Sequence, residues 1–338
     1  MSKKNGNGKT KIAYLFPGQG QGTIKVGMGK EAFQYSRRAR RVFRVADSCL
    51  RRERPFSELC FEGPEEELFK TQNSQLASLI VSLAHLAIRS NVNKEDGDLV
   101  FEPKGKNRPN YLVGHSVGYI AALVCAGSIN FLQAIDIVRV RSVLMSMACR
   151  ERPGRMSVLF HPNIRAIEKL CLLSLAQIGN YNDRTQIVLS GPNATMEQLE
   201  AVIRANRLAS RIIPLETEGA FHSKCMDPVV APFAEYVSRL RFLDLEIPII
   251  GNTKAQIVKT AAEAKQELVE QISLPVRWFQ SMAVLNRLGV NATVEMCGDV
   301  LSRNLARSGS KRVKILSYTK ELAKRLASRK NKGETASL

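Results

Sequence analysis

A serine bracketed by glycines, Gly114-His115-Ser116-Val117-Gly118, is the first place in this sequence where chemistry is expected. It follows a short apolar run and precedes a helix-like segment, a context that lifts a serine hydroxyl clear of its neighbours. The helix that follows offers free N–H groups and a positive dipole end to a developing oxyanion. The pattern predicts Ser116 as a nucleophile. A purely structural serine in a tight turn is the alternative that these five residues leave open.

A serine nucleophile needs a base, because its hydroxyl reacts weakly at neutral pH. His222 is the candidate, since it stands in the loop Gly219-Ala220-Phe221-His222-Ser223 directly after a compact α/β segment. A loop at that point can carry a histidine into a cleft between two parts of the chain. An ordinary loop histidine is the alternative. Of the other histidines, His85 falls in an apolar helical segment, His161 precedes a proline, and His115 adjoins the nucleophile.

The elements that must position these residues alternate between strands and helices. Short apolar runs predict the strands of a parallel sheet at 12–16, 111–113, 248–251, 292–295 and 313–317. Helical periodicity predicts helices at 31–52, 75–90, 119–126 and 130–148. The stretch 91–109 is polar and rich in Lys, Gly and Pro, so we expect an exposed loop there.

A second unit interrupts this series. Residues 154–215 alternate as strand, helix, strand, strand, helix and strand, which is the order of a ferredoxin-like unit. The chain is therefore predicted to be an α/β protein with a large domain, 12–153 and 216–320, and an inserted small domain, 154–215. We expect residues 1–11 to be a disordered basic N-terminus and 321–338 a basic C-terminal tail.

Composition narrows the class of protein. The 338 residues are 44% hydrophobic and 24% charged. No apolar run approaches the roughly 20 residues of a membrane span, so we expect a soluble protein and no membrane partner. Seven scattered cysteines without a C-x-x-C pair point to the reducing cytoplasm. The four histidines lack the spacing of metal ligands, so no metal is expected.

The formal net charge is +19, and eight arginines fall in one short stretch that includes most of the helix predicted at 31–52. That helix must present a basic face, which suits an acidic protein partner, a nucleic acid, or solvent alone. We do not expect nucleic acid, because no aromatic residues interleave with the basic ones. The arginines are Arg37, Arg38, Arg40, Arg41, Arg44, Arg51, Arg52 and Arg54.

Taken together, the motifs resemble the malonyl-CoA:acyl carrier protein transacylases, the acyltransferase family shared by fatty acid and polyketide synthases. The resemblance covers roughly residues 12–318 and implies an α/β-hydrolase-like large domain. The motifs that carry it, in family order, are Phe16-Pro17-Gly18-Gln19-Gly20, Gln75-Leu76-Ala77, Gly114 to Gly118, Val138-Arg139-Val140-Arg141, Gly179-Asn180-Tyr181-Asn182, Gly219 to Ser223, Gly251-Asn252 and Pro275-Val276-Arg277-Trp278.

The resemblance implies the machinery of acyl transfer. Ser116 is then the nucleophile and His222 the general base and acid. The backbone N–H groups of Gln19 and Val117 form the oxyanion hole. The family uses no triad aspartate, so the backbone carbonyl of Gln271 orients the histidine.

The same resemblance implies the substrate-binding residues. Arg141 corresponds to the arginine that pairs with the free carboxylate of the malonyl group, a task that suits a planar, permanently charged fork. Gln75, Met145 and Phe221 complete the set. The bulk of Phe221 beside the base favours malonyl over branched extender units.

The implied reaction is a ping-pong transfer of malonyl from malonyl-CoA to the phosphopantetheine thiol of acyl carrier protein, with no cofactor and no metal. It supplies extender units for fatty acid or polyketide synthesis. The basic surface would dock an acidic carrier, and we expect a monomer. Departures from the family pattern include Tyr119, where an acidic residue is usual.

Two rival functions stay open at this stage. One is an acyl-editing serine hydrolase of the same fold, which would share Ser116 and His222. The other is a non-catalytic module that docks carrier proteins. Arg141 disfavours a neutral-ester hydrolase, and the intact trio of Ser116, His222 and Arg141 disfavours a non-catalytic module.

Overall fold

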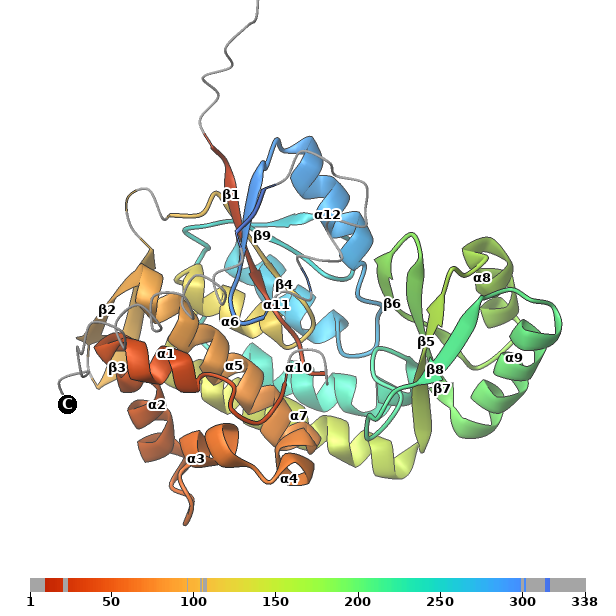
Figure 1. Ribbon diagram of the computed structural model, residues 1–338, viewed down its shortest axis with the longest axis horizontal. Coiled ribbons are helices and arrows are strands. Elements are labelled where there is room, and N and C mark those ends of the chain that lie inside the picture. The colour runs from red at the N-terminus through yellow and green to blue at the C-terminus, as the bar shows by residue number, and fades with distance from the viewer. Residues whose placement is uncertain are drawn as a thin grey trace, which may run out of the picture.

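The computed structural model describes residues 10–20, 24–95, 97–103, 105, 108–298 and 301, and the backbone of 314–316. The N-terminal segment 1–9 and the predicted C-terminal tail 321–338 lie outside these residues. The described chain forms a six-stranded sheet, a four-stranded sheet and a two-stranded hairpin (Figure 1). No helix within these ranges combines the length and the apolar character needed to cross a membrane.

The six-stranded sheet carries the predicted parallel strands. Its order is β10-β9-β4-β1-β11-β12, and every neighbouring pair is parallel except β9 with β10. The strands are β1 (Ile12–Phe16), β4 (Tyr111–Gly114), β9 (Ile249–Ile250), β10 (Ile257–Val258), β11 (Ala292–Glu295) and β12 (Lys314–Leu316).

Both faces of this sheet are buried, as a parallel sheet requires. In β1, Tyr14 and Phe16 belong to one apolar core, whereas Ala13 and Leu15 belong to another, because successive strand side chains point to opposite faces. Helix α12 (Trp278–Arg287) packs on the second face. The helices that contribute to the first, larger core are α1 (Lys30–Tyr35), α2 (Arg37–Leu50), α3 (Phe56–Glu62), α4 (Glu65–Phe69), α5 (Thr71–Arg89), α6 (Gly118–Cys125), α7 (Phe131–Glu151), α10 (Val230–Ser238) and α11 (Ala261–Glu270).

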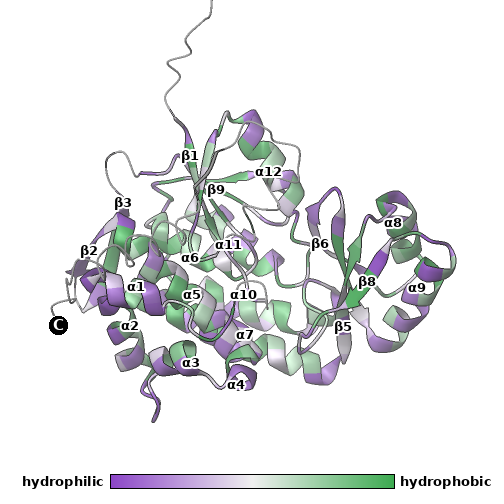
Figure 2. Cartoon of the chain, viewed as in Figure 1, coloured by the Kyte–Doolittle hydropathy of each residue, from purple (hydrophilic) through white to green (hydrophobic). Residues whose placement is uncertain are grey.

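The four-stranded sheet is the predicted small unit and has its own apolar core. Its order is β6-β7-β5-β8 with all pairs antiparallel, the order of a ferredoxin-like unit. Hydrophilic, purple segments mark its helices in Figure 2. The elements are β5 (Gly154–Phe160), α8 (Ile164–Leu172), β6 (Gln177–Asp183), β7 (Gln186–Pro192), α9 (Asn193–Ala205) and β8 (Arg211–Pro214). The predicted α/β fold class is confirmed, whereas the domain boundaries at 153/154 and 215/216 stay a prediction.

The predicted loop at 91–109 is wrong over most of its length. Residues 90–103 form a hairpin of β2 (Ser90–Glu95) and β3 (Asp98–Pro103), and Glu95 pairs with Asp98 across its turn. The turn contains Asp-Gly, whose glycine adopts a φ of 88°, as a two-residue hairpin turn demands. Burial of Val92, Leu99 and Phe101 holds the hairpin on the larger core.

The single helix predicted at 31–52 is also wrong. Ser36 adopts an extended conformation, with φ −131° and ψ 126°, and divides the segment into α1 and α2. Its side-chain oxygen then caps α2 by accepting a hydrogen bond from the Ala39 N–H, at 3.4 Å.

Candidate active site

Ser116 lies on a sharp turn between β4 and α6. Its φ of 52° falls in the left-handed region, which residues other than glycine rarely adopt. A Cβ atom at Gly114 would lie 2.2 Å from the Tyr119 nitrogen, and one at Gly118 would lie 2.2 Å from the Phe16 oxygen. Only glycine fits at these two positions, so the bracketing glycines allow the strained turn that presents the serine.

The turn places the serine against the predicted base. Ser116 Oγ lies 2.8 Å from His222 Nε2, and His222 Nδ1 lies 2.7 Å from the backbone oxygen of Gln271. A carbonyl only accepts hydrogen bonds, so Nδ1 carries the proton and Nε2 accepts from the Ser116 hydroxyl. Burial, and after it the positive charge of Arg141, lower the pKa of His222 to about 3. The imidazole is neutral near pH 7, the state that a general base needs.

Arg141 on α7 is fully buried beside the same serine. Its Nη2 donates to Ser116 Oγ at 3.2 Å, and its Nη1 donates to Gln75 Oε1 at 2.5 Å. Gln75 Nε2 in turn lies 3.5 Å from the sulfur of Met145. The structure thus brings together three of the predicted substrate-binding residues from α5 and α7, around the predicted nucleophile.

The Arg141 guanidinium lacks an anionic partner among the residues that the structure describes. Within the described part of the chain no carboxylate forms an ion pair with it, and its Nε makes no hydrogen bond. Burial lowers the pKa of Arg141 to about 10, which still leaves the group charged at neutral pH. A buried charge without a counterion is costly, so this arrangement favours an anionic group beside Ser116.

The two backbone amides predicted to form the oxyanion hole belong to segments that follow neighbouring strands of the sheet. Val117 precedes the first turn of α6, and Gln19 follows the end of β1, which pairs with β4. Among the described residues neither amide N–H donates a hydrogen bond to a protein group. The predicted oxyanion role of Gln19 and Val117 stays a prediction.

Phe221 directly precedes the predicted base in the chain. Its side chain is buried in the larger core, and its carbonyl accepts a hydrogen bond of 2.6 Å from Ser190 Oγ on β7. Gln177 on β6 donates to the carbonyl of His222 at 2.9 Å. The small sheet therefore supports the loop that carries the base. The predicted role of Phe221 in acyl choice stays a prediction.

The other histidines stand apart from this arrangement. His115 is partly buried, with its ring centroid 5.5 Å from that of Trp278, and desolvation lowers its pKa to about 4. His85 is buried in α5. Within the described ranges no group of three His, Cys, Asp or Glu side chains is suited to hold a metal ion.

Sequence reasoning missed one side chain at the nucleophile. Asn252 accepts a hydrogen bond of 3.0 Å from the Ser116 N–H through Oδ1, and donates one of 2.9 Å to the Gly114 carbonyl through Nδ2. It spans both sides of the serine turn. Its only sequence signal was the Gly251-Asn252 pair after a predicted strand.

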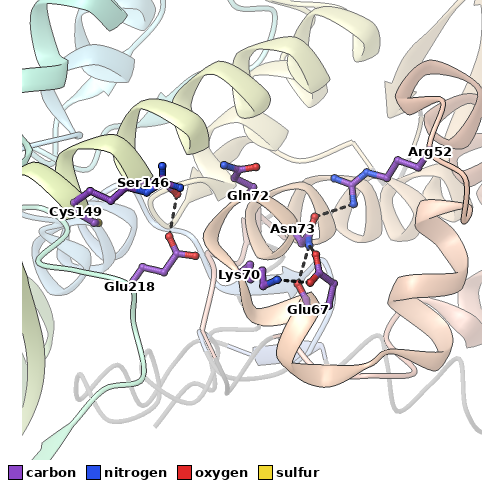
Figure 3. Close-up of a pocket in the computed structure, with 9 residues that line it drawn as sticks. Arg52, Glu67, Lys70, Gln72, Asn73, Ser146, Cys149 and Glu218 are labelled. Carbon is purple, nitrogen blue, oxygen red and sulfur yellow. Dashed lines mark hydrogen bonds and ion pairs between the residues drawn. The ribbon is translucent and has the colours of Figure 1, made fainter.

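A cavity of about 560 Å³ is lined by residues of α5 and α7 that neighbour the predicted substrate-binding residues in sequence (Figure 3). Gln72 stands one turn before Gln75 in α5, and Ser146 follows Met145 in α7. Glu218 lines this cavity and accepts hydrogen bonds from Ser146 Oγ at 2.9 Å and from the Thr71 N–H at 2.7 Å. These bonds connect the loop before His222 to both helices.

The chain was compared with known proteins. The family model for the acyl transferase domain matches residues 13–307. A curated relative, malonyl CoA-acyl carrier protein transacylase of Bacillus subtilis strain 168, is 34% identical over 92% of this chain and 94% of its own. The protein of the same name from Staphylococcus aureus strain COL is 30% identical over 91% of this chain and 95% of its own.

Solved structures agree with these relatives. An acyl carrier protein S-malonyltransferase from Vibrio cholerae superposes with a TM-score of 0.80 at 29% identity, covering 90% of this chain and 96% of its own. A malonyl-transacylase in complex with its type II polyketide synthase acyl-carrier protein superposes with a TM-score of 0.82 at 28% identity, covering 94% of this chain and 100% of its own. The resemblance drawn from the motifs is confirmed. The chain belongs to the acyl transferase domain family, alongside the malonyl CoA-acyl carrier protein transacylases.

Proposed function

We propose that this protein transfers the malonyl group of malonyl-CoA to the phosphopantetheine thiol of an acyl carrier protein through an ester on Ser116. One observation carries the proposal: Arg141, buried, charged and without a carboxylate partner among the described residues, lies 3.2 Å from the Ser116 hydroxyl. An acyl group that ends in a carboxylate supplies the missing anion. A neutral acyl group leaves the guanidinium unpaired.

In the first half of the cycle, His222 Nε2 accepts the Ser116 proton as Oγ attacks the thioester carbon. The carbonyl oxygen becomes an oxyanion, which the amides of Gln19 and Val117 stabilise. The intermediate collapses by breaking the C–S bond, and the CoA sulfur takes the proton from His222. The products are free CoA and malonyl-Ser116.

In the second half, the same groups act in the reverse direction. His222 removes the proton of the phosphopantetheine thiol, and the sulfur attacks the ester carbon. The ester C–O bond then breaks, and His222 returns the proton to Ser116 Oγ. The malonyl group leaves on the carrier protein, and the enzyme is unchanged.

Arg141 also connects acyl choice to the strength of the base. Its charge contributes to the lowered pKa of His222. Once a malonyl carboxylate neutralises that charge, protonation of His222 becomes less unfavourable. The proposed substrate therefore strengthens the base, whereas acetyl does not.

Transfer and hydrolysis differ in what happens to the acyl-enzyme. With malonyl-CoA alone, a transferase releases about one CoA per enzyme and then stops, because the ester awaits a thiol. Addition of holo acyl carrier protein restores turnover. An acyl-editing hydrolase releases CoA continuously without the carrier, and a non-catalytic module releases none. A time course of free CoA, followed through its thiol, therefore distinguishes the transferase, the hydrolase and the non-catalytic module.

We further propose that the basic surface attracts an acidic carrier protein. A groove of about 440 Å³ between α2 and β2 is lined by Arg37, Arg40, Arg41, Arg44, Lys94 and Val45, with no acidic residue among them. Helix α2 lies on the side of the protein remote from the small sheet (Figure 1). Charges outside the contact between two proteins raise the rate at which they meet. The groove is therefore suited to attract the carrier protein and not to hold it at Ser116.

The proposed reaction also bears on cofactor use, cellular location and oligomeric state. The proposed cycle uses the thioester of CoA and the phosphopantetheine of the carrier, so no further cofactor takes part. All seven cysteines are free thiols, which supports a reducing, cytoplasmic location. A monomer suffices, since every residue of the proposed cycle comes from one chain.

A further inference from the structure

Helix α11 ends at the catalytic base. Its C-cap residue, Gln271, supplies the carbonyl oxygen that lies 2.7 Å from His222 Nδ1. The Gln271 N–H itself donates to the carbonyl of Glu267, one turn earlier, at 3.1 Å. The last turn of α11 therefore fixes where the histidine is held.

The Glu267 carboxylate in that turn is buried, with 6% of the residue exposed, and faces the serine turn through a neighbouring loop. Its Oε1 accepts hydrogen bonds from the N–H groups of Asn252, at 2.6 Å, and Thr253, at 2.9 Å. Its Oε2 accepts one from Thr253 Oγ1 at 2.7 Å. A Cβ atom at Gly251 would lie 2.7 Å from the same Oε2, so the glycine leaves room for the carboxylate.

Asn252 carries this connection to the nucleophile. Its side chain holds the N–H of Ser116 and the carbonyl of Gly114, the two sides of the strained turn. Its own backbone is fixed by Glu267. A continuous chain of hydrogen bonds therefore runs from α11 through Asn252 to the serine, while the same helix holds the histidine.

We propose that Glu267 is a positioning residue for acyl transfer. Through Asn252 it fixes the place of the Ser116 turn. Gln271, the C-cap of the same helix, fixes the place of His222, so α11 sets the distance between the two. This inference rests on the proposed roles of Ser116 and His222. It assigns to Glu267 the function of a hydrogen-bond acceptor, with no contact to the acyl group. Arg141 is held separately, by Gln75 from α5.

The contacts of Glu267 with Asn252 are separate from the contact of Arg141 with Gln75, so one can be removed while the other stays. Loss of Glu267 lengthens the approach of Ser116 to His222, and a misplacement of that kind costs about 10²-fold in rate. The guanidinium of Arg141 stays in place, so KM for malonyl-CoA stays near the wild-type value while kcat falls. A loss of folding alone would lower the fraction of active enzyme and leave kcat per active site unchanged.

The measurement is the rate at which an uncharged fluorophosphonate labels Ser116, followed by intact-protein mass spectrometry, together with kcat and KM for malonyl-CoA. Glu267→Ala is expected to slow labelling by about 10²-fold. Glu267→Gln is expected to label near the wild-type rate, because its amide oxygen accepts both N–H groups and its NH₂ donates to Thr253 Oγ1. Asn252→Ala leaves the Glu267 contacts with the backbone intact and is expected to be slow as well.

Glu263→Ala is the matched control. Glu263 lies on the same helix, is exposed, and caps its first turn by accepting from the N–H groups of Lys259 and Thr260. The proposal is overturned if Glu267→Ala and Asn252→Ala label near the wild-type rate, if Glu267→Gln is as slow as Glu267→Ala, or if Glu263→Ala is equally slow. Should Glu267→Ala fail to fold, Asn252→Ala and Glu267→Gln decide the matter. Fast labelling of wild type without any malonyl adduct would contradict the proposed function and leave this inference standing.

Discussion

The buried Arg141 guanidinium donates a hydrogen bond of 3.2 Å to the Ser116 hydroxyl. In the part of the chain that the structure describes, no carboxylate accompanies this charge. A cation held this close to a nucleophile selects an acyl group with its own carboxylate, and it also affects the neighbouring base. Both effects give measurable predictions.

Replacement of Arg141 should separate malonyl from acetyl transfer. Two hydrogen bonds to a charged group, about 1.5–3 kcal/mol each, correspond to a loss of about 10²- to 10⁴-fold in kcat/KM for malonyl-CoA in Arg141→Ala. Acetyl-CoA, which lacks the second carboxylate, should lose far less. Arg139→Ala is the matched control, since Arg139 lies on the same helix, is exposed and pairs with Asp136. Equal losses for both thioesters would refute the assigned role.

The pH dependence of the free enzyme follows from His222. Its pKa of about 3 lies below the ordinary 6.5, so the base stays neutral well into the acid range. The rate of labelling by an uncharged fluorophosphonate should therefore fall to half only well below pH 6.5. In Arg141→Ala the half-point should move to higher pH, because a positive charge that opposed protonation is gone. A wild-type half-point at pH 6.5, or a downward shift in the variant, would contradict this account.

The same pKa shift affects stability. Between pH 6.5 and about 3 the unfolded chain binds a proton at His222 that the folded protein does not. This group therefore contributes to the free energy of unfolding above pH 6.5, and its contribution is lost as the pH falls through that window. Denaturant titrations of wild type and His222→Gln across this range should show a smaller acid loss in the variant.

Gln271 should act through its backbone alone. Its side-chain Oε1 and Nε2 are buried, and neither has a hydrogen-bond partner among the described residues. Removal of unsatisfied buried polar atoms relieves a cost of about 1–3 kcal/mol. Gln271→Met should therefore raise Tm and keep the Ser116 labelling rate near that of wild type. A large loss of labelling without loss of folding would show that the side chain itself acts on His222.

Charge reversal in the α2 groove should affect only the second half-reaction. Arg37→Glu, Arg44→Glu and Lys94→Glu combined should lower kcat/KM for the carrier at low salt, with CoA release from malonyl-CoA unchanged. Added salt should reduce the difference, because the Debye length shortens from about 10 Å at 0.1 M to about 3 Å at 1 M. Arg165→Glu with Arg207→Glu, exposed on the small unit, provides the control. If kcat/KM for the carrier protein is unchanged in the groove variant, the groove does not attract the carrier.

The sequence predicted the parts of the site that local patterns record. The glycines around Ser116 are required by contacts within a few residues, and the continuous apolar run of β1 reports a strand buried on both faces. The loop position of His222 made it the candidate base, and the family resemblance added Arg141 and Gln271. The structure brings His222 and Arg141 to the serine and the Gln271 carbonyl to His222. Their roles stay predictions that the experiments above test.

Other parts depended on distant contacts and left little local signal. Glu267 is one of three glutamates in α11, and only the fold places its carboxylate on the backbone N–H of Asn252. The hairpin at 90–103 is polar, and its stability comes from Val92, Leu99 and Phe101 on a core that the segment itself does not reveal. The break at Ser36 was hidden because the buried apolar residues of α2 follow Ala32 of α1 at the spacing of one continuous helix; they are Ala39, Val42, Phe43 and Ala46.

The most direct test of the central claim is intact-protein mass spectrometry after brief incubation with malonyl-CoA, acetyl-CoA or methylmalonyl-CoA. A malonyl transferase acting through Ser116 should give a malonyl-sized adduct on wild type that is absent from Ser116→Ala and is discharged when holo acyl carrier protein is added. Acetyl and methylmalonyl adducts should form more slowly. No adduct with any thioester, or an adduct that only water removes, would contradict it.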